Sequence, residues 1–90
     1  MKKGIITVVG KDHVGIIGRV CTYLAEGNVN ILDISQTIMD GYFNMMMVVD
    51  ITNLNSSFEV LAEGLEALGK ELGMIIRIQH TEIFDSMHRI

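Results

Sequence analysis

Apolar residues recur along the first third of the chain in two patterns. Residues 4–9 are apolar apart from Thr7 and rich in β-branched side chains, which is typical of an interior strand. Gly27 and Asn28 are typical helix-stop residues, and the carboxylate of Asp12 is the predicted N-cap of the preceding helix. The apolar residues between these signals recur at spacings of three and four and predict one buried helix face: Ile17, Val20, Cys21, Leu24 and Ala25.

The dipeptide Asp40-Gly41 predicts a tight β-hairpin, because both residues tolerate the positive φ angles of a type I′ turn. One face of the predicted hairpin is apolar except for Gln36, which either caps the sheet edge or is turned outward by a β-bulge. The other face is mixed. On the apolar face, Ile38, Gln36, Ile34 and Leu32 stand opposite Phe43, Met45, Met47 and Val49. On the mixed face, Met39, Thr37, Ser35 and Asp33 stand opposite Tyr42, Asn44, Met46 and Val48.

A second helix and a fourth strand follow the hairpin. Ser56 and Glu59 fit a capping box, and Gly73 is the predicted stop of the helix. Its apolar face consists of Phe58, Leu61, Ala62, Leu65, Leu68 and Leu72. The next residues alternate, which predicts a half-buried strand, with Met74, Ile76 and Ile78 on one face and Ile75, Arg77 and Gln79 on the other. Residues 81–90 carry a last helical stripe of Ile83, Phe84, Met87 and Ile90, and a helix this short must dock on something.

The order of elements is βαββαβ followed by a short C-terminal helix. Right-handed crossovers then predict an α+β, ferredoxin-like plait: a four-stranded antiparallel sheet with two helices on one face. No Pro-rich, low-complexity or charged linker divides the sequence, so residues 1–90 are expected to form a single domain. The opposite sheet face includes Met39, Met46 and Val48, and either the terminal stripe or a partner subunit should cover it.

Composition narrows the classes of function. Hydrophobic residues make up 49% of a chain of only 90 residues, which favours a homodimer or a higher even-numbered homo-oligomer, because so small a domain has a thin core. The net charge of −4 does not indicate the excess of basic residues that binding to nucleic acid or an anionic membrane requires. Cys21 stands alone, and His13, His80 and His88 are too far apart in sequence to support a metal site. The longest apolar run, residues 45–49, is too short to span a bilayer, so a cytoplasmic protein is expected.

The candidate chemistry lies between the first strand and the first helix. Gly10 and Gly15 allow close approach of a ligand to the backbone, and the following helix N-terminus offers N–H groups to a small carboxylate. An ordinary capped turn explains the same residues. Asn30 either binds a ligand from the start of the second strand or closes the loop, while Asp33 and Ser35 are expected to be solvated or interfacial. With no nucleophile–base pair and no paired carboxylates, no enzyme and no cofactor are predicted.

These motifs resemble those of the ACT domain. They are Val9-Gly10-x-Asp12-x-x-Gly15-Ile16, Gly27-x-Val29-Asn30-Ile31 and the Asp40-Gly41 hairpin. Over essentially its whole length the chain is similar to small stand-alone ACT-domain proteins of bacteria and archaea, including Ile34-Ser35-Gln36-Thr37 and Ile83-Phe84. The resemblance implies a regulatory module that binds an amino acid at a dimer interface, between the loop after the first strand of one protomer and the second-strand region of another. The matching positions are Gly10, Asp12, His13, Val14, Gly15, Ile16, Asn30 and Ile31.

Other proteins with the same plait fit the sequence less well. An RNA-recognition module needs basic charge and exposed aromatic residues on its central strands. An acylphosphatase-like enzyme would use an Arg in the first loop, where Lys11 stands, and a copper chaperone needs a Cys-x-x-Cys motif. The alternative that stays open is a ligand-free assembly partner that regulates another protein through sheet or helix contacts.

Overall fold

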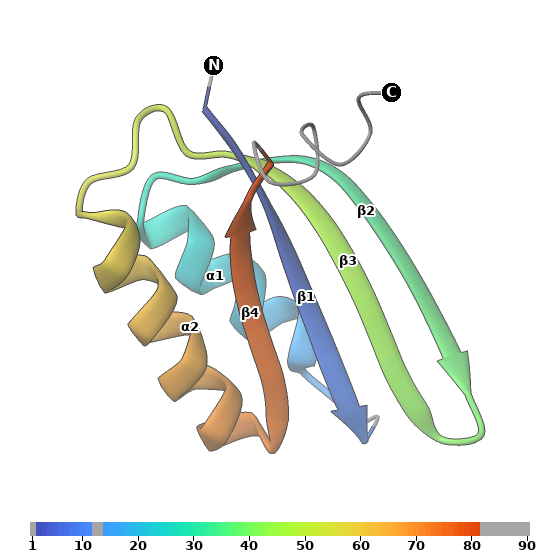
Figure 1. Ribbon diagram of the computed structural model, residues 1–90. Helices are drawn as coiled ribbons and strands as arrows, with labels where there is room; N and C mark the ends of the chain where they lie inside the picture. Colours follow the sequence, from blue (N-terminus) through green and yellow to red (C-terminus); the bar gives the residue numbers. More distant parts are fainter. Residues whose placement is uncertain (1, 12–13, 82–90) are drawn as a thin grey trace.

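The computed structural model describes residues 2–11 and 14–81. The elements are β1 (Lys3–Lys11), α1 (Ile16–Glu26), β2 (Asn30–Met39), β3 (Tyr42–Asp50), α2 (Phe58–Leu72) and β4 (Met74–His80). The four strands pair antiparallel in the order β2-β3-β1-β4, and both helices lie on one face of the sheet (Figure 1). The predicted ferredoxin-like plait is therefore confirmed, while the predicted C-terminal helix lies outside the described residues.

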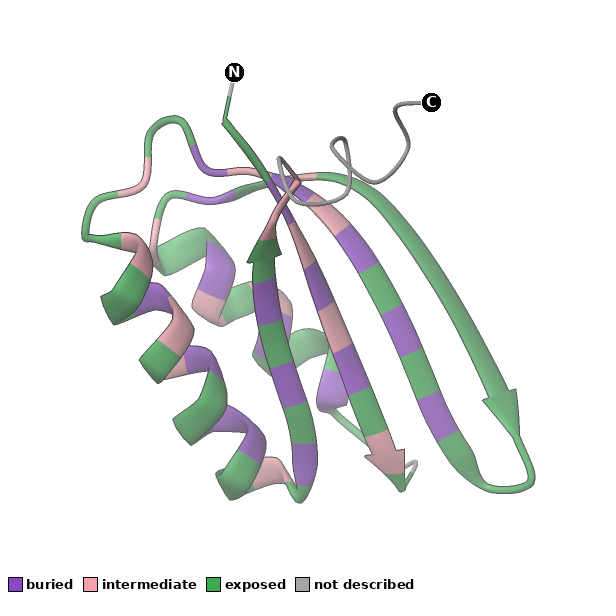
Figure 2. Ribbon diagram, viewed as in Figure 1, coloured by how far each residue is buried: buried purple, intermediate pink, exposed green. Residues whose placement is uncertain are grey.

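The core lies between the helices and the inner face of β1, β3 and β4. Alternate residues of these strands are buried, which gives the striped pattern of Figure 2. The strands contribute Ile6, Val8, Phe43, Met45, Met47, Val49, Met74, Ile76 and Ile78. The helices contribute Ile16, Val20, Leu24, Leu61, Leu65 and Leu68, and Cys21 is half-buried against them. The other sheet face, which we call the outer face, carries Ile5, Thr7, Val9, Met46, Val48, Ile75, Arg77 and Gln79, together with the outward residues of β2.

The edge strand β2 does not share this burial. All its residues except Ile31 are exposed, so the strand is exposed along almost its whole length (Figure 2). Ile38 is 59% exposed although its cross-strand neighbour Phe43 is 3% exposed. The predicted apolar face therefore exists, but its β2 half stays open because the two helices cover the other strands. Gln36 is directed to the same side as Ile38 and is exposed for the same reason.

The register of the hairpin follows the prediction from Met39/Tyr42 down to Asp33/Val48. Asp40 and Gly41 have φ angles of 55° and 81°, as a type I′ turn requires. The predicted pair of Leu32 with Val49 is wrong, because the register shifts between Ile31 and Asp33 and Val49 pairs with Ile31. A β-bulge at Leu32 explains this, since one strand there carries an extra residue.

The start of α1 differs from the sequence prediction. Gly15 is the N-cap, with φ 92° and no side-chain cap, so the prediction of Asp12 as N-cap is wrong; Asp12 itself lies outside the described residues. The buried face is rotated accordingly: Ile16 is 2% exposed and Ile17 is 38% exposed. A glycine that adopts positive φ turns the chain into the helix later than a side-chain cap at Asp12 would.

The other helix ends agree more closely with the sequence. α1 ends at Glu26 with Gly27 as its C-cap. Asn28, which follows the cap, has φ 62° and donates its N–H to the Ala25 carbonyl at 3.0 Å, while the Val29 N–H donates to the Leu24 carbonyl at 2.9 Å. This is a Schellman motif and confirms the predicted stop. At α2, however, the Ser57 hydroxyl accepts from the Val60 N–H at 3.1 Å, so the predicted Ser56–Glu59 capping box is one residue out of register.

Candidate functional site

The predicted ligand loop joins β1 to α1 at the end of the sheet where the β2–β3 hairpin turns. Gly10 still belongs to β1, opposite Phe43 on one side and Met74 on the other. A Cβ at Gly10 would lie 2.6 Å from the Met74 sulfur and 3.1 Å from the Gly73 carbonyl oxygen, so a larger residue would crowd the packing beside β4. Asp12 and His13 lie outside the described residues, and Val14 is fully exposed.

Gly15 is the residue of the loop best suited to a ligand. A Cβ there would meet no atom of the described residues within 4 Å, so the described structure leaves the space beside its backbone open. Within the described residues no side chain caps α1, and the first N–H groups of any helix lack intrahelical partners. The side chain of Ile16 is buried in the core, so this residue can offer a ligand only its main chain. The arrangement suits a carboxylate at the positive end of the helix dipole.

Asn30 and Ile31 lie at the opposite end of the sheet. Asn30 pairs with Asp50, which in turn pairs with Lys3 at the start of β1. Ile38 is level with Gly10, with Phe43 of β3 between them. From Asn30 to Ile38 the strand runs about 26 Å at roughly 3.3 Å per residue. The structure therefore does not bring the two halves of the predicted site together within one chain.

The surroundings of Asn30 form a shallow polar hollow of about 430 Å³. The amide of Asn28 donates to the carbonyl of Asn53 at 2.8 Å, and Ala25 and Val29 complete the lining. The Asp50 carboxylate also lines it and accepts hydrogen bonds from the hydroxyl and the N–H of Thr52, which lower the pKa of Asp50 below its usual value. Sequence reasoning missed Asp50 and Asn53, because only the pairing of β2 with β3 brings them beside Asn30.

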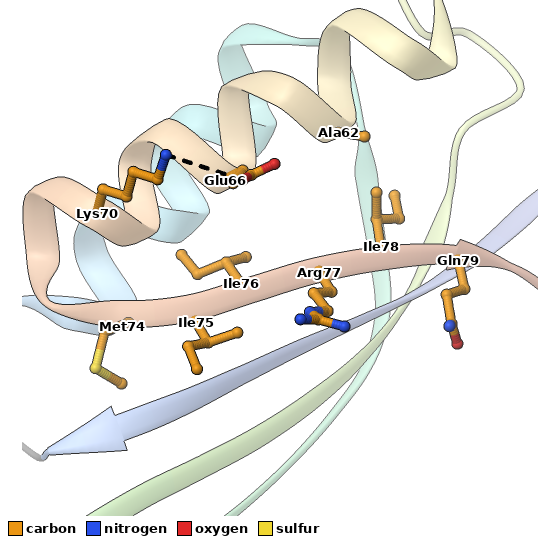
Figure 3. A pocket seen from close by; sticks show the side chains of 9 residues that line it. All are labelled: Ala62, Glu66, Lys70, Met74, Ile75, Ile76, Arg77, Ile78 and Gln79. Carbon is orange, nitrogen blue, oxygen red and sulfur yellow. Dashed lines mark ion pairs between the residues drawn. The ribbon is translucent and has the colours of Figure 1, made fainter.

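A larger groove, of about 460 Å³, runs along the free edge of β4 beneath α2 (Figure 3). Ala62, Glu66 and Lys70 form the helix side, and the Glu66–Lys70 ion pair of 4.0 Å lies above the strand. None of the predicted site residues lines this groove. An exposed strand edge beside a helix suits an extended polypeptide more than a small metabolite, because the edge offers a row of main-chain donors and acceptors.

Metal chemistry finds no support in the described part of the chain, where no three His, Cys, Asp or Glu side chains are placed to hold an ion. The described His80 stacks on Phe58 with ring centroids 3.9 Å apart. Among the described residues no helix has the length and apolar character that a membrane crossing requires.

Comparisons with known proteins agree with this fold. A family model described as the ACT domain matches residues 4–79. The chain is 62% identical to a UPF0237 protein of Bifidobacterium longum and 49% identical to one of Methanocaldococcus jannaschii, each over 90 residues and over 100% of both chains. A solved ACT domain protein from Streptococcus pneumoniae superposes with a TM-score of 0.82 at 47% identity, covering 92% of this chain and 93% of that one.

Proposed function

This chain belongs to the ACT domain family, and from that premise we propose that it is a regulatory module that binds an amino acid or a related small carboxylate where two copies of the chain meet. The observation that carries the proposal is the separation of the two halves of the site. The open backbone at Gly15 and the hollow at Asn30 lie at opposite ends of one sheet, so a small ligand can touch both only across an interface.

The unprotected edge of β2 supports a second copy as the partner. Natural edge strands are commonly protected by Lys, Pro or a covering element. β2 has no Lys and no Pro, and neither of the two described helices covers it. Met39 and Tyr42 flank a two-residue turn and so form a hydrogen-bonded pair. Hydrogen-bonded and non-hydrogen-bonded pairs alternate along the antiparallel strands, so the main-chain N–H and C=O of Gln36 point away from β3, toward the free edge of β2.

An antiparallel pair of β2 strands centred on Gln36 satisfies these edge groups. It sets Ile34 of each copy beside Ile38 of the other, which shields side chains that are 41% and 59% exposed in one chain. It also keeps the two Asp33 carboxylates apart. Each Asn30 then lies near the end of the sheet where the other copy's loop enters α1.

The chemistry of the two halves is complementary to that of an amino acid. The N–H groups at the start of α1 suit the carboxylate. The hollow around Asn30, with the Asp50 carboxylate and several amide groups, suits the ammonium group. Because the net charge of −4 does not favour anions in general, the helix N-terminus must supply the attraction for the carboxylate.

Calorimetric titration of the twenty amino acids against the purified protein tests the proposal. We expect at least one of them to bind with a Kd below the millimolar range. Asn30→Ala should weaken that binding at least tenfold. Asn44→Ala, the same change at an exposed position of β3, should leave it unchanged. Gly15→Asp should also abolish binding, but the φ angle of 92° strains any side chain there, so Asn30 gives the cleaner variant.

The assembly-partner alternative rests on the groove beneath α2, because the free edge of β4 there offers an extended segment both main-chain pairing and an apolar floor. If none of the amino acids binds the wild-type protein, or if Asn30→Ala binds as the wild type does, the ligand site is refuted. The assembly-partner function, with the groove as its candidate surface, then takes its place.

A further inference from the structure

We propose that the free edge of β4 binds a short extended segment of another protein, antiparallel to the strand, with an acidic residue opposite Arg77 and apolar residues opposite Ile76 and Ile78. The proposal names the kind of partner that fits the groove beneath α2 (Figure 3). It does not rest on the amino-acid site, and either can fail without the other, because the groove lies along β4 whereas the copies are proposed to meet at β2.

The alternation of hydrogen bonds across the sheet determines which main-chain groups of β4 reach its free edge. Along each strand, a residue that bonds the strand on one side is followed by a residue that faces the other side. The registers of β3 with β1 and of β1 with β4 show no shift, so the alternation that starts at the β2–β3 turn makes Thr7 and Arg77 a hydrogen-bonded pair. The N–H and C=O of Ile76 and Ile78 therefore point to the free edge, where the described sheet has no further strand.

Arg77 sets the charge that an added strand must carry. It is exposed on the outer face and takes part in neither of the two ion pairs found within the described residues. Because its own main chain bonds Thr7, an antiparallel strand at the free edge faces Arg77 in a non-hydrogen-bonded pair, in which the opposed Cβ atoms lie only about 5 Å apart. Opposite charges in such a pair stabilise the pairing and like charges weaken it, so this edge selects an acidic residue.

The side chains before and after Arg77 determine what must flank that acidic residue. Ile76 and Ile78 point toward α2, whereas Arg77 points away from it (Figure 3). Both isoleucines are buried and, with Ala62 of α2, give the groove of about 460 Å³ an apolar lining. In an added strand, the residues before and after the acidic one lie about 7 Å apart and on the side of α2. Apolar side chains at these two positions enter the groove.

A second copy of this chain does not suit the same edge. If two copies pair through β2, further pairing through β4 would extend the sheet from copy to copy without closing, which produces a filament instead of a defined oligomer. A register centred on Arg77 would also place two guanidinium groups directly opposite each other. The occupant is therefore a segment of a different protein.

Titration of the isotope-labelled full-length protein with the peptide acetyl-Thr-Val-Glu-Val-Thr-amide tests the proposal. We expect the amide signals of Ile76 and Ile78 to shift, while that of Gln36 on the edge of β2 stays unchanged. The Ile78 N–H should exchange quickly with solvent in the free protein and become protected by the peptide. Slow exchange without peptide would show that a second copy or another part of the chain already covers the edge, and would overturn the proposal. Unchanged signals at millimolar peptide would overturn it as well.

An exchange of charges gives the sharper measurement. The same peptide with Lys in place of Glu should bind the wild type about tenfold more weakly. Arg77→Glu changes an exposed side chain and should reverse this preference. Lys2→Glu makes the same change in net charge at an exposed position outside the groove and should retain it. Equal affinities of the two peptides for the wild type, or an unchanged preference in Arg77→Glu, would refute the proposal.

Discussion

Gly69 shows how a single residue sets the packing of α2 on β4. A Cβ at this buried position would lie 2.7 Å from the Met74 carbonyl oxygen and 3.2 Å from the Ile76 nitrogen, and main-chain atoms cannot rotate away. We expect Gly69→Ala to cost about 1–2 kcal/mol of unfolding free energy, because overpacking outweighs the better helix propensity of Ala. Urea unfolding at fixed protein concentration measures this.

The control for this prediction is Gly18→Ala in α1. A Cβ at Gly18 would meet nothing within 4 Å, so only helix propensity acts and the change should stabilise the protein by up to about 1 kcal/mol. A change of the same sign in both variants would contradict the packing role of Gly69.

The pKa of Asp50 gives a prediction about acid stability. Hydrogen bonds from the Thr52 hydroxyl, and then from the Thr52 N–H, lower this pKa below the usual value of 3.8. The ionised carboxylate therefore favours the folded state at pH values above the unfolded pKa, and this contribution is lost as the pH falls through the lowered folded pKa. Carboxyl NMR titration should show the pKa of Asp50 rising toward its usual value in Thr52→Val. An identical titration in the variant would disprove this role of the hydroxyl.

Residue types predicted local structure well only where those same residues fix the backbone conformation. Asp40-Gly41 determined its own turn and, through it, the register of the hairpin. Gly10 and Gly15 looked equivalent in sequence, but a side chain at Gly10 would crowd Gly73 and Met74, whereas Gly15 adopts a positive φ angle. That distinction depends on which strand lies beside β1, which a pattern along the chain does not contain.

At the scale of elements, the type and order of every described helix and strand followed from apolar periodicity. Which strands the helices cover did not follow from it. Periodicity shows which side of β2 is apolar, but whether a helix lies over Ile34 and Ile38 depends on how two helices are distributed over four strands. The separation of Asn30 from Gly15 could not be predicted from periodicity either, because it follows from strand pairing.

The corrected cap of α2 provides a prediction at this scale. The Ser57 hydroxyl accepts the Val60 N–H at 3.1 Å, and loss of such a cap costs about 1 kcal/mol. Thermal unfolding should therefore show Ser57→Ala less stable than the wild type, while Ser56→Ala melts at the same temperature. The reverse order would restore the capping box expected from Ser56 and Glu59.

At the scale of the whole molecule, the open surfaces decide how copies associate. The edge of β2 is proposed to pair with the same edge of a second copy, which shields Ile34 and Ile38. The groove beneath α2 lies along β4, at the opposite edge of the sheet, so binding of a ligand between copies and contact with a partner protein can occur together.

A dimer paired through β2 must become more stable as its concentration rises. Each tenfold increase in protein concentration adds about 1.4 kcal/mol to the free energy of unfolding of the dimer. For a dimer of this size, that raises the melting temperature by about 3–5 °C. Ile38→Lys places a charge within the paired edges, beside Ile34 of the other copy, on a side chain already 59% exposed, so the monomer should fold and its melting temperature should not depend on concentration. Val60→Lys changes a side chain that is 53% exposed on α2 and should behave like the wild type.

Calorimetry over a hundredfold concentration range, with sedimentation equilibrium on the same samples, separates a dimer from a monomer. A concentration-independent wild type that sediments as a 10.0 kDa species would refute the dimer and with it a site shared between copies.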